Sequence, residues 1–337
     1  MSASNYGVRI LGCICVVSGV LAGGVLNAAT ISKSLSAIFR QPGLFSSLTE
    51  PPCSYMSTEH RKGFVAIDDP AVSWIRGPHN GGAVPIRHFL SGPRILNDTY
   101  GLFFYDPGAE FVSVFEKDYG YEFEGWRNGI MIARGPDGSL YSTLSGKAIS
   151  GPQEGKRLKR VPSLRTTWGH WLMLHPESTA YNLFDGEKYP VNPIPNESNP
   201  AIGKAIQSAD PRLPAETLVM GVEKKSGRAY QLAVEKERAV VNDVLHETPL
   251  TIFWYGPTRS GVAFSAKVDG RTLSFRADEI APETAPFMDN ETNSRWTLAG
   301  RAVDGPLRGK ELKWIDSVQC KWYAWAYEYP QTDVYSK

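Results

Sequence analysis

Apolar positions follow one pattern at the N-terminal end of the chain and another beyond it. Ile10 to Ala29 are twenty consecutive uncharged residues, and a helix of that length spans about 30 Å, the thickness of the hydrocarbon core of a bilayer. A cleaved signal peptide is the alternative, because Asn27-Ala28-Ala29 offers small residues, but the apolar run is long for one. We expect a retained membrane helix, continued by an amphipathic helical stripe from Ile31 to Phe39, so that residues 1–45 form an anchor region.

The anchor also predicts a location. Arg9 precedes the apolar run, and Lys33 and Arg40 follow it, so the positive-inside bias is nearly neutral. A first apolar segment followed by a long domain usually exports that domain. We therefore expect a single-pass protein of the cell membrane, with its bulk in the periplasm or otherwise outside the cytoplasm. Gly19 and Gly23 are spaced for close helix contact and are a candidate contact within the membrane.

Beyond the anchor, apolar residues come in short runs broken by turn residues. Leu102–Tyr105 and Phe111–Phe115 are aromatic and β-branched runs, and Asp106-Pro107-Gly108 separates them. Asp269-Gly270 between alternating residues is a hairpin signal. The 32 Gly, 24 Pro and 11% aromatic residues likewise favour many short strands and turns. The predicted fold class is mainly β, a β-rich α+β fold.

An internal duplication organises the chain. Residues 141–181 align with residues 295–335 without a gap, and 15 of the 41 aligned positions are identical. Self-similarity of this extent predicts two tandem copies of one strand-rich module, each ending in a short helix. The first copy is expected over residues 63–185 and the second over residues 217–337.

The remaining segments are expected to join these parts. Residues 46–62 are predicted to be a linker between the anchor and the first copy. Residues 186–216 are rich in Pro and are predicted to be an extended connector rather than a packed element. Ser163 and Ser317 are candidate N-caps of the short helices, and Pro176 and Pro330 follow those helices.

Each short helix carries two tryptophans. Trp168 and Trp171, like Trp322 and Trp325, are three residues apart and share one helix face. Such a pair is either a platform for stacking a ligand or an anchor that pins the helix to its sheet. Recurrence in both copies favours the anchor.

Aromatic residues that occur only in the second copy suggest a different role. The aligned positions of the first copy are not aromatic, and large amphipathic rings concentrate at interfaces. We therefore predict a partner-docking surface in the second copy. Its candidate residues are Trp296, Trp314, Tyr323, Tyr327 and Tyr329. The alternative is that these rings pack against the connector or the other copy.

These landmarks resemble a bacterial family known as domain of unknown function 3179. The resemblance covers roughly residues 63–335, and the block from Leu298 to Leu312 is its most specific part. It implies a tandem, β-rich, often exported protein and brings no established activity. Family members often carry Tyr-Cys-Pro-Leu-Cys in the first copy, a thiol pair suited to redox chemistry or a soft metal. This chain has Tyr105-Asp106-Pro107-Gly108-Ala109 instead, which argues against such chemistry here.

Charge and motifs exclude several classes of function. Lys and Arg total 36 against 35 for Asp and Glu, and no run of like charge indicates a nucleic-acid partner. No nucleotide-binding loop or nucleophile elbow is present. His170 and His175 are five apart, which is not the spacing of a zinc helix, so we expect no metal and no cofactor. Whether Cys53 and Cys320 form a disulfide stays open.

The expected function is that of a membrane-anchored, extracytoplasmic, non-catalytic protein. Residues 10–29 contact the bilayer, and the partners are other subunits of a larger membrane complex, respiratory or photosynthetic, which this accessory subunit stabilises. The alternative is an enzyme or a protein that binds a small ligand or carbohydrate in a cleft between the copies. The residues that would line that cleft are Asn97, Asp98, Tyr105 and Asp106, although Asn and Asp also commonly bond the backbone of their own turns.

Overall fold

The computed structural model describes residues 37–61, 65–75, 81–90, 92–181 and 199–336. The chain divides into two units, Met1–Ala37 and Ile38–Lys337, and the fold below is that of the second. The predicted membrane helix, with Gly19 and Gly23, lies outside the described residues. Among the residues that are described, none of the helices combines the length and the apolar character needed to cross a membrane.

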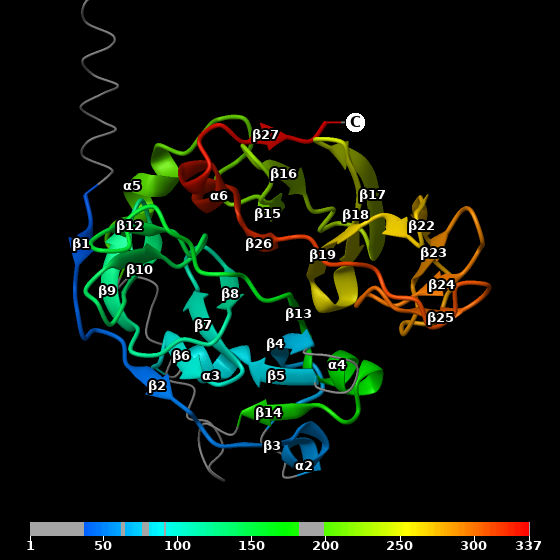
Figure 1. Cartoon of the computed structure of the whole chain (residues 1–337), viewed down its shortest axis with the longest axis horizontal. Coiled ribbons are helices and arrows are strands. Elements are labelled where there is room, and N and C mark those ends of the chain that lie inside the picture. Colours follow the sequence, from blue (N-terminus) through cyan, green and yellow to red (C-terminus); the bar gives the residue numbers. More distant parts are fainter. Residues whose placement is uncertain (1–36, 62–64, 76–80, 91, 182–198, 337) are drawn as a thin grey trace, which may run out of the picture. The chain divides into compact units, whose positions relative to one another are not determined.

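Strands dominate the second unit, as predicted, and they form several sheets along the chain (Figure 1). The first set begins with a sheet in the order β13-β4-β5-β14-β3. It continues with the orders β2-β6-β7-β8 and β1-β9-β10-β11-β12. The bounds in chain order are β1 Phe39–Arg40, β2 Ser47–Thr49, β3 Cys53–Tyr55, β4 Pro70–Ile75, β5 Gly81–Pro85, β6 Ile95–Asp98, β7 Gly101–Asp106, β8 Phe111–Phe115, β9 Glu122–Arg127, β10 Ile130–Arg134, β11 Leu140–Ser142, β12 Ala148–Ser150, β13 Ser163–Thr167 and β14 Thr179–Tyr181.

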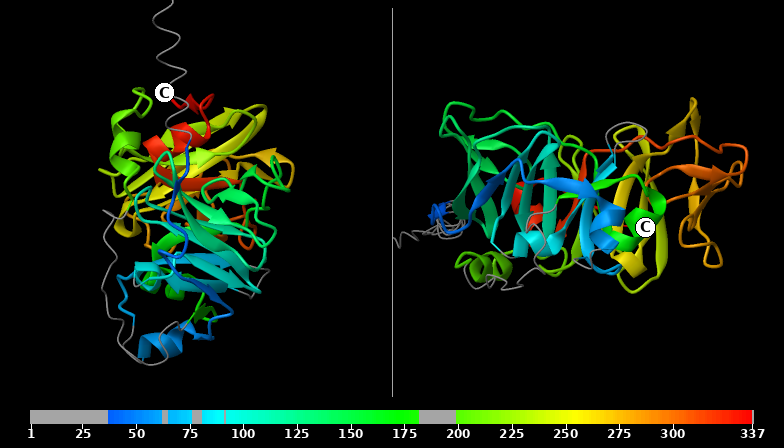
Figure 2. Two further views of the ribbon diagram at one scale, coloured as in Figure 1. Left: turned by 90° about the vertical axis from the view of Figure 1, so that its left-hand side faces the viewer. Right: turned by 90° about the horizontal axis from the view of Figure 1, so that it is seen from below.

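The second set, later in the chain, has similar strand orders but lacks counterparts of the outer strands β3, β2 and β1. Its sheets are β26-β15-β16-β27, β17-β18-β19 and β22-β23-β24-β25, with a separate β20-β21 hairpin. In Figure 2 the orange β22–β25 strands lie beyond the yellow β17–β19 strands, and β22 contacts β17. The bounds are β15 Leu218–Val222, β16 Arg228–Gln231, β17 Arg238–Leu245, β18 Thr248–Tyr255, β19 Ser260–Ser265, β20 Lys267–Val268, β21 Arg271–Thr272, β22 Phe275–Ala277, β23 Phe287–Asp289, β24 Arg295–Trp296, β25 Ala302–Asp304, β26 Ser317–Lys321 and β27 Asp333–Val334.

The helices are short, and all of those described except α5 follow directly after a strand. They are α2 Met56–Arg61, α3 Ile86–Leu90, α4 Trp168–Leu174, α5 Ile202–Gln207, the 3₁₀ turn η2 Gly256–Thr258, and α6 Trp322–Glu328. The strand β14 that follows α4 pairs in parallel with β5, and the strand β27 that follows α6 pairs in parallel with β16. Each tryptophan-bearing helix therefore connects an antiparallel edge strand to a parallel one.

Burial explains why these segments are strands. Every residue of β7 is buried, and so are the last six residues of β18. Each is the central strand of its sheet or next to the centre, and a strand covered on both faces reads as a continuous apolar run. The Asp269-Gly270 hairpin is confirmed: Val268 pairs with Arg271, and both turn residues have positive φ.

The tryptophan pairs are framework, as predicted. Trp168, Trp171, Trp322 and Trp325 are all fully buried. Trp171 Nε1 donates to Ser178 Oγ over 3.0 Å, and Trp325 Nε1 donates to Thr332 Oγ1 over 2.8 Å. The predicted N-caps were misplaced, because Ser163 and Ser317 begin strands β13 and β26 instead. The residue that caps α4 is Thr167, whose side chain accepts a hydrogen bond from His170 N.

The segment predicted as a linker is built into the sheets. Ser47–Thr49 pairs in parallel with β6, and Cys53–Tyr55 pairs with β14. Phe45 and Met56 are buried on either side, and burial of these apolar side chains draws the intervening chain onto the edge strands. The helical stripe expected to reach Phe39 is also corrected, because Phe39 lies in β1 opposite Trp126.

The described part of the predicted connector contains a packed helix. Ile202, Ala205 and Ile206 have the i, i+3, i+4 spacing of an apolar helix face, and all three contact the core cluster that contains α6. Figure 1 shows α5 beside α6. The high proline content of the whole segment suggested an extended chain. None of the prolines falls within residues 201–210, however, so a short helix can form there.

Candidate functional site: a groove beside helix α4

Two of the predicted docking residues lie inside the protein. Trp296 and Tyr323 have 0% of their surface exposed. Trp296 Nε1 donates to Asp289 Oδ2 over 2.9 Å, and Tyr323 packs against Gly129 and contacts the cluster of Ala205. The prediction that they meet a partner is therefore wrong, because a buried ring has no surface to offer.

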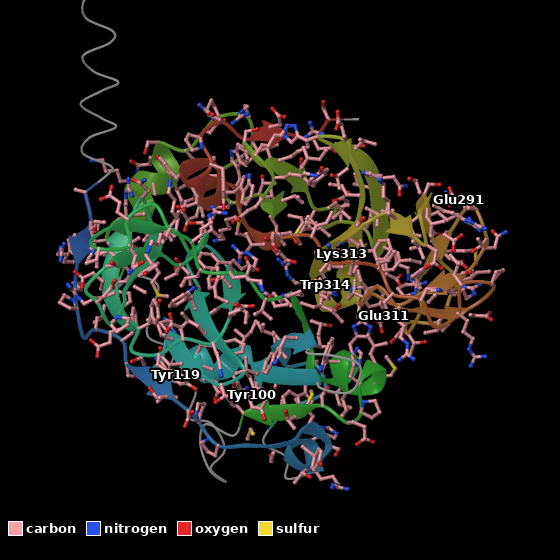
Figure 3. The ribbon with its side chains drawn as sticks, in the orientation of Figure 1. Tyr100, Tyr119, Glu291, Glu311, Lys313 and Trp314 are labelled. Atoms are coloured by element: carbon pink, nitrogen blue, oxygen red, sulfur yellow. The ribbon has the colours of Figure 1, made fainter. Side chains whose placement is uncertain are left out.

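The other three predicted docking residues have neighbours within the chain. Trp314 is half-buried, with its ring edge-on to Phe264 at 5.1 Å between centroids (Figure 3). Tyr327 Oη donates to the carbonyl oxygen of Ser208 over 2.8 Å, and Tyr329 Oη donates to the carboxylate of Glu223. Ser208 belongs to the segment predicted as a connector, residues 186–216. Tyr327 therefore packs against the connector, which was the alternative to a docking role.

The four residues proposed for an alternative cleft are buried. Asn97 Nδ2 donates to the carbonyl of Tyr121, whose N–H donates back to Asn97 Oδ1 over 3.1 Å. Asp98 Oδ1 accepts from the N–H of Tyr100 over 2.9 Å. Both Asn97 and Asp98 therefore serve the backbone around them, the structural role considered at the outset.

Asp106 and Tyr105 are likewise framework residues. Asp106 Oδ1 accepts from Ala109 N over 3.1 Å, and Oδ2 accepts from Met131 N over 2.8 Å. Burial raises the pKa of the Asp106 carboxyl, while these N–H groups oppose the rise. Burial also raises the pKa of Tyr105 to about 12. The cavity beside Asp106 has a volume of about 10 Å³, room for roughly one water molecule.

A larger groove lies between α4 and the turn after β18. Its volume is about 540 Å³, within the range of roughly 300–1,000 Å³ typical of small-molecule sites. The lining comes from segments that are far apart in sequence: His60 of α2, the loop residues Ile67 and Asp68, Thr167, Gly169, His170, Leu172 and Met173 at α4, and Tyr255, Pro257, Thr258 and Glu283.

Backbone hydrogen bonds hold the first turn of α4 against the 67–69 loop. Trp168 N donates to Asp69 O, and Gly169 N donates to Ile67 O, both over 2.8 Å. A Cβ atom on Gly169 would lie 2.2 Å from Ile67 Cγ2, so a larger residue would push this loop away. The aligned residue of α6 is Tyr323, whose N–H likewise donates to a loop carbonyl, that of Ala215, over 2.9 Å, but whose ring packs against Gly129.

Two buried polar side chains face each other at the floor of the groove. The ring centroids of His170 and Tyr255 are 5.3 Å apart. His170 Nδ1 lies 2.9 Å from Thr166 Oγ1, whereas His170 Nε2 and Tyr255 Oη form no hydrogen bond of normal geometry. The backbone of Glu283 is the nearest hydrogen-bonding neighbour of His170, and Arg238 is that of Tyr255. Because poorly satisfied buried polar atoms lower stability, a ligand that offers these two atoms better-aligned hydrogen bonds would gain affinity.

Burial sets the protonation of this pair. It lowers the pKa of His170 to about 4 and raises that of Tyr255. At neutral pH both groups are therefore uncharged. The groove offers neutral donors and acceptors among apolar side chains, with the carboxylates of Asp68 and Glu283 in its lining.

The sequence alone marks His170 only as a histidine poorly spaced for zinc, and it does not single out Tyr255. Their proximity depends on the packing of β13, which leads into α4, against η2 after β18, and no local pattern reveals that contact. Over the described residues, no group of three or more His, Cys, Asp or Glu side chains could hold a metal ion. Cys53, which is exposed, and Cys320, which is buried, are both free thiols and lie in different sheets.

Comparison with known proteins assigns the chain to a sequence family. No curated protein and no solved structure matches it. A family model described as a protein of unknown function (DUF3179) matches residues 126–332, which is more than half of the chain. The match spans α4, η2 and α6, and therefore most of the groove. The chain belongs to the DUF3179 family.

Proposed function

We propose that this protein is a non-catalytic, extracytoplasmic binding protein that takes a small, largely apolar molecule into the groove beside α4. The observation that carries the proposal is the groove itself, with its apolar lining and the two buried polar atoms, His170 Nε2 and Tyr255 Oη. An apolar cavity with a few convergent polar groups is typical of small-molecule sites. The ligand has an apolar body and a group that hydrogen-bonds His170 or Tyr255.

The protonation of His170 supports binding rather than acid–base catalysis. A general base works best when its pKa lies near the operating pH, and burial holds the pKa of His170 at about 4. Such an imidazole remains neutral through the physiological range and serves as a fixed hydrogen-bonding group.

The comparison of the two tryptophan helices supports the groove as a site. The face of α6 that carries Tyr323 and Tyr327 packs against α5. The aligned residues of α4 are Gly169 and Met173, and Met173 is 48% exposed at the groove. Within the described part of the chain, α5 therefore covers this face of α6, whereas the corresponding face of α4 is open to a ligand.

The proposal includes a tandem duplication. Similar strand orders, the two indole-to-hydroxyl bonds at Trp171 and Trp325, and parallel strands after both helices support it. Duplication provides two similar modules. In the first, the helix α4 has Gly169 and Met173 in place of the tyrosines of α6, and the module keeps its fold.

Residues 10–29 anchor the protein to the membrane in this proposal, with its bulk outside the cytoplasm. Twenty uncharged residues support the anchor. A second proposal is the accessory-subunit role, in which a side chain of a partner subunit occupies the groove. The exposed Ile67 and Met173 in the lining favour it, since a partner would remove both from water.

Mass spectrometry of the extracted protein tests these proposals. The full chain is extracted from membranes with a styrene–maleic acid copolymer, because detergent would compete for an apolar groove. Met173→Arg places a charge in the groove, and Val244→Arg is the matched control, since Val244 is 59% exposed on β17. We expect wild type and Val244→Arg to carry one small molecule that Met173→Arg loses.

The outcomes separate the two functions. A partner protein lost from Met173→Arg, with no small molecule lost, would favour the accessory subunit. Identical small molecules at identical levels in all three proteins would contradict the ligand groove.

A further inference from the structure

A second cavity lies where α6 meets the β9–β10–β11 sheet. Its volume is about 300 Å³. Asn128-Gly129 forms the two-residue turn between β9 and β10, with φ values of 51° and 74° that suit a tight hairpin. The turn sets Arg127 beside Ile130 at one wall, while Glu328 at the end of α6 forms the other.

Three polar atoms that belong to lining residues of this cavity are buried and have no hydrogen-bond partner among the described residues. They are Arg127 Nε, Asn128 Oδ1 and Ser142 Oγ. Ser142 is only 2% exposed, so bulk water does not satisfy its hydroxyl. Nearly all buried polar groups in proteins have a hydrogen-bond partner, and three unpaired atoms around one cavity indicate a ligand that supplies the missing bonds.

The lining of the cavity contains two cations, Arg127 and Lys147, and one carboxylate, Glu328. Among the described residues, neither Arg127 nor Lys147 forms an ion pair. Among the residues that the structure describes, Glu328 accepts one hydrogen bond, from Ser145 Oγ to its Oε1. A ligand can therefore meet a cation at the hairpin and a carboxylate at the helix.

We propose that this cavity binds a free amino acid with an apolar side chain. The ligand carboxylate pairs with the Arg127 guanidinium, which suits a carboxylate geometrically, and accepts from the Ser142 hydroxyl. The ligand ammonium donates to Glu328 and to Asn128 Oδ1. The side chain lies against Ile130, Ile132 and the neighbouring apolar wall. This site differs in location and chemistry from the groove beside α4 and does not depend on it.

Titration calorimetry of the full chain in lipid nanodiscs tests the proposal. The probes are L-leucine, 4-methylpentanoate, which lacks the ammonium group, and 3-methylbutylamine, which lacks the carboxylate. We expect saturable binding of leucine and at least about tenfold weaker binding of the other two, because each loses one charged contact.

Variants assign the binding to this cavity. Arg127→Gln and Glu328→Gln should each weaken leucine binding at least about tenfold, and Arg127→Lys should restore part of the loss. Lys313→Gln, at an exposed residue (Figure 3) that is not part of the cavity lining, and Met173→Arg should bind leucine as the wild type does. Melting temperatures close to that of the wild type show that each variant is folded, and Glu328→Gln keeps an acceptor for Ser145.

Three results would overturn the proposal. They are the absence of saturable leucine binding, equal affinity of 4-methylpentanoate and leucine, and unchanged affinity in both Arg127→Gln and Glu328→Gln. Since Met173→Arg affects only the groove beside α4, failure of the groove proposal leaves these results unchanged.

Discussion

The imidazole of His170 and the phenol ring of Tyr255 lie 5.3 Å apart at a tilt of 35°. His170 belongs to α4 and Tyr255 ends β18, so the pair joins two segments that are distant along the chain. Burial holds both groups in their neutral forms. This pair makes the groove a place for hydrogen bonding in apolar surroundings.

The pair predicts acid sensitivity. The pKa of His170 is about 4 in the folded protein, against about 6.5 in an unfolded chain. The unfolded state therefore takes up a proton first as the pH falls. The stability that depends on neutral His170 is complete above about pH 6.5 and is lost towards pH 4, at up to about 1.4 kcal/mol per pH unit. His170→Gln should flatten the decline of melting temperature between pH 7 and pH 5. A variant with the same pH dependence as the wild type would show that another group is responsible.

The two indole hydrogen bonds predict matched losses of stability. Trp171→Phe and Trp325→Phe each remove a buried N–H and leave the hydroxyl of Ser178 or Thr332 without its donor. Each should lower the free energy of unfolding by about 1–3 kcal/mol. In a double-mutant cycle, Trp325→Phe combined with Thr332→Val should cost less than the sum of the single changes. Strict additivity would mean that the bond contributes nothing.

Tyr323 is predicted to act on stability and not on partner binding. Its ring is fully buried against Gly129 and Ala205, so Tyr323→Ser should lower the free energy of unfolding by about 3–5 kcal/mol. Tyr327→Phe is the control, because it removes only the bond to Ser208 and should cost about 1 kcal/mol. Thermal unfolding followed by near-ultraviolet circular dichroism measures both. If the Tyr323→Ser protein were as stable as the wild type, the ring of Tyr323 would not be part of the core.

Cys53 offers a test of topology. It is a free, exposed thiol in β3, whereas Cys320 is buried. If residues beyond the anchor lie outside the cytoplasm, a membrane-impermeant maleimide should label the protein in intact spheroplasts, and Cys53→Ser should abolish the labelling. Labelling that appears only after the cells are broken would place Cys53 in the cytoplasm.

Local patterns were sufficient for some features of the fold. The Asp269-Gly270 hairpin followed from its turn residues, and the burial of Trp168 and Trp322 followed from their spacing and recurrence. These features depend on neighbours in sequence or on a helix face. The mainly β fold class has the same origin, since alternation and turn residues are properties of short segments.

Other features depend on which surface a segment meets. Tyr323 looks like a docking residue until α5 is known to cover it, and α5 was hidden among prolines. Phe39 continues a helical stripe in sequence, yet it pairs as a strand with Trp126. The groove was missed because His170 and Tyr255 are brought together only by tertiary packing.

Binding of a neutral fluorescent probe tests the groove most directly. N-phenyl-1-naphthylamine has an apolar body and one N–H group, and it accepts excitation energy from tryptophans such as Trp168 and Trp171 in α4. Full-length protein in nanodiscs is titrated with the probe, and the signal of empty nanodiscs is subtracted. Saturable energy transfer in wild type and Val244→Arg, weakened at least about tenfold in Met173→Arg, is the predicted result. The same titration curve for all three proteins would contradict a ligand site beside α4.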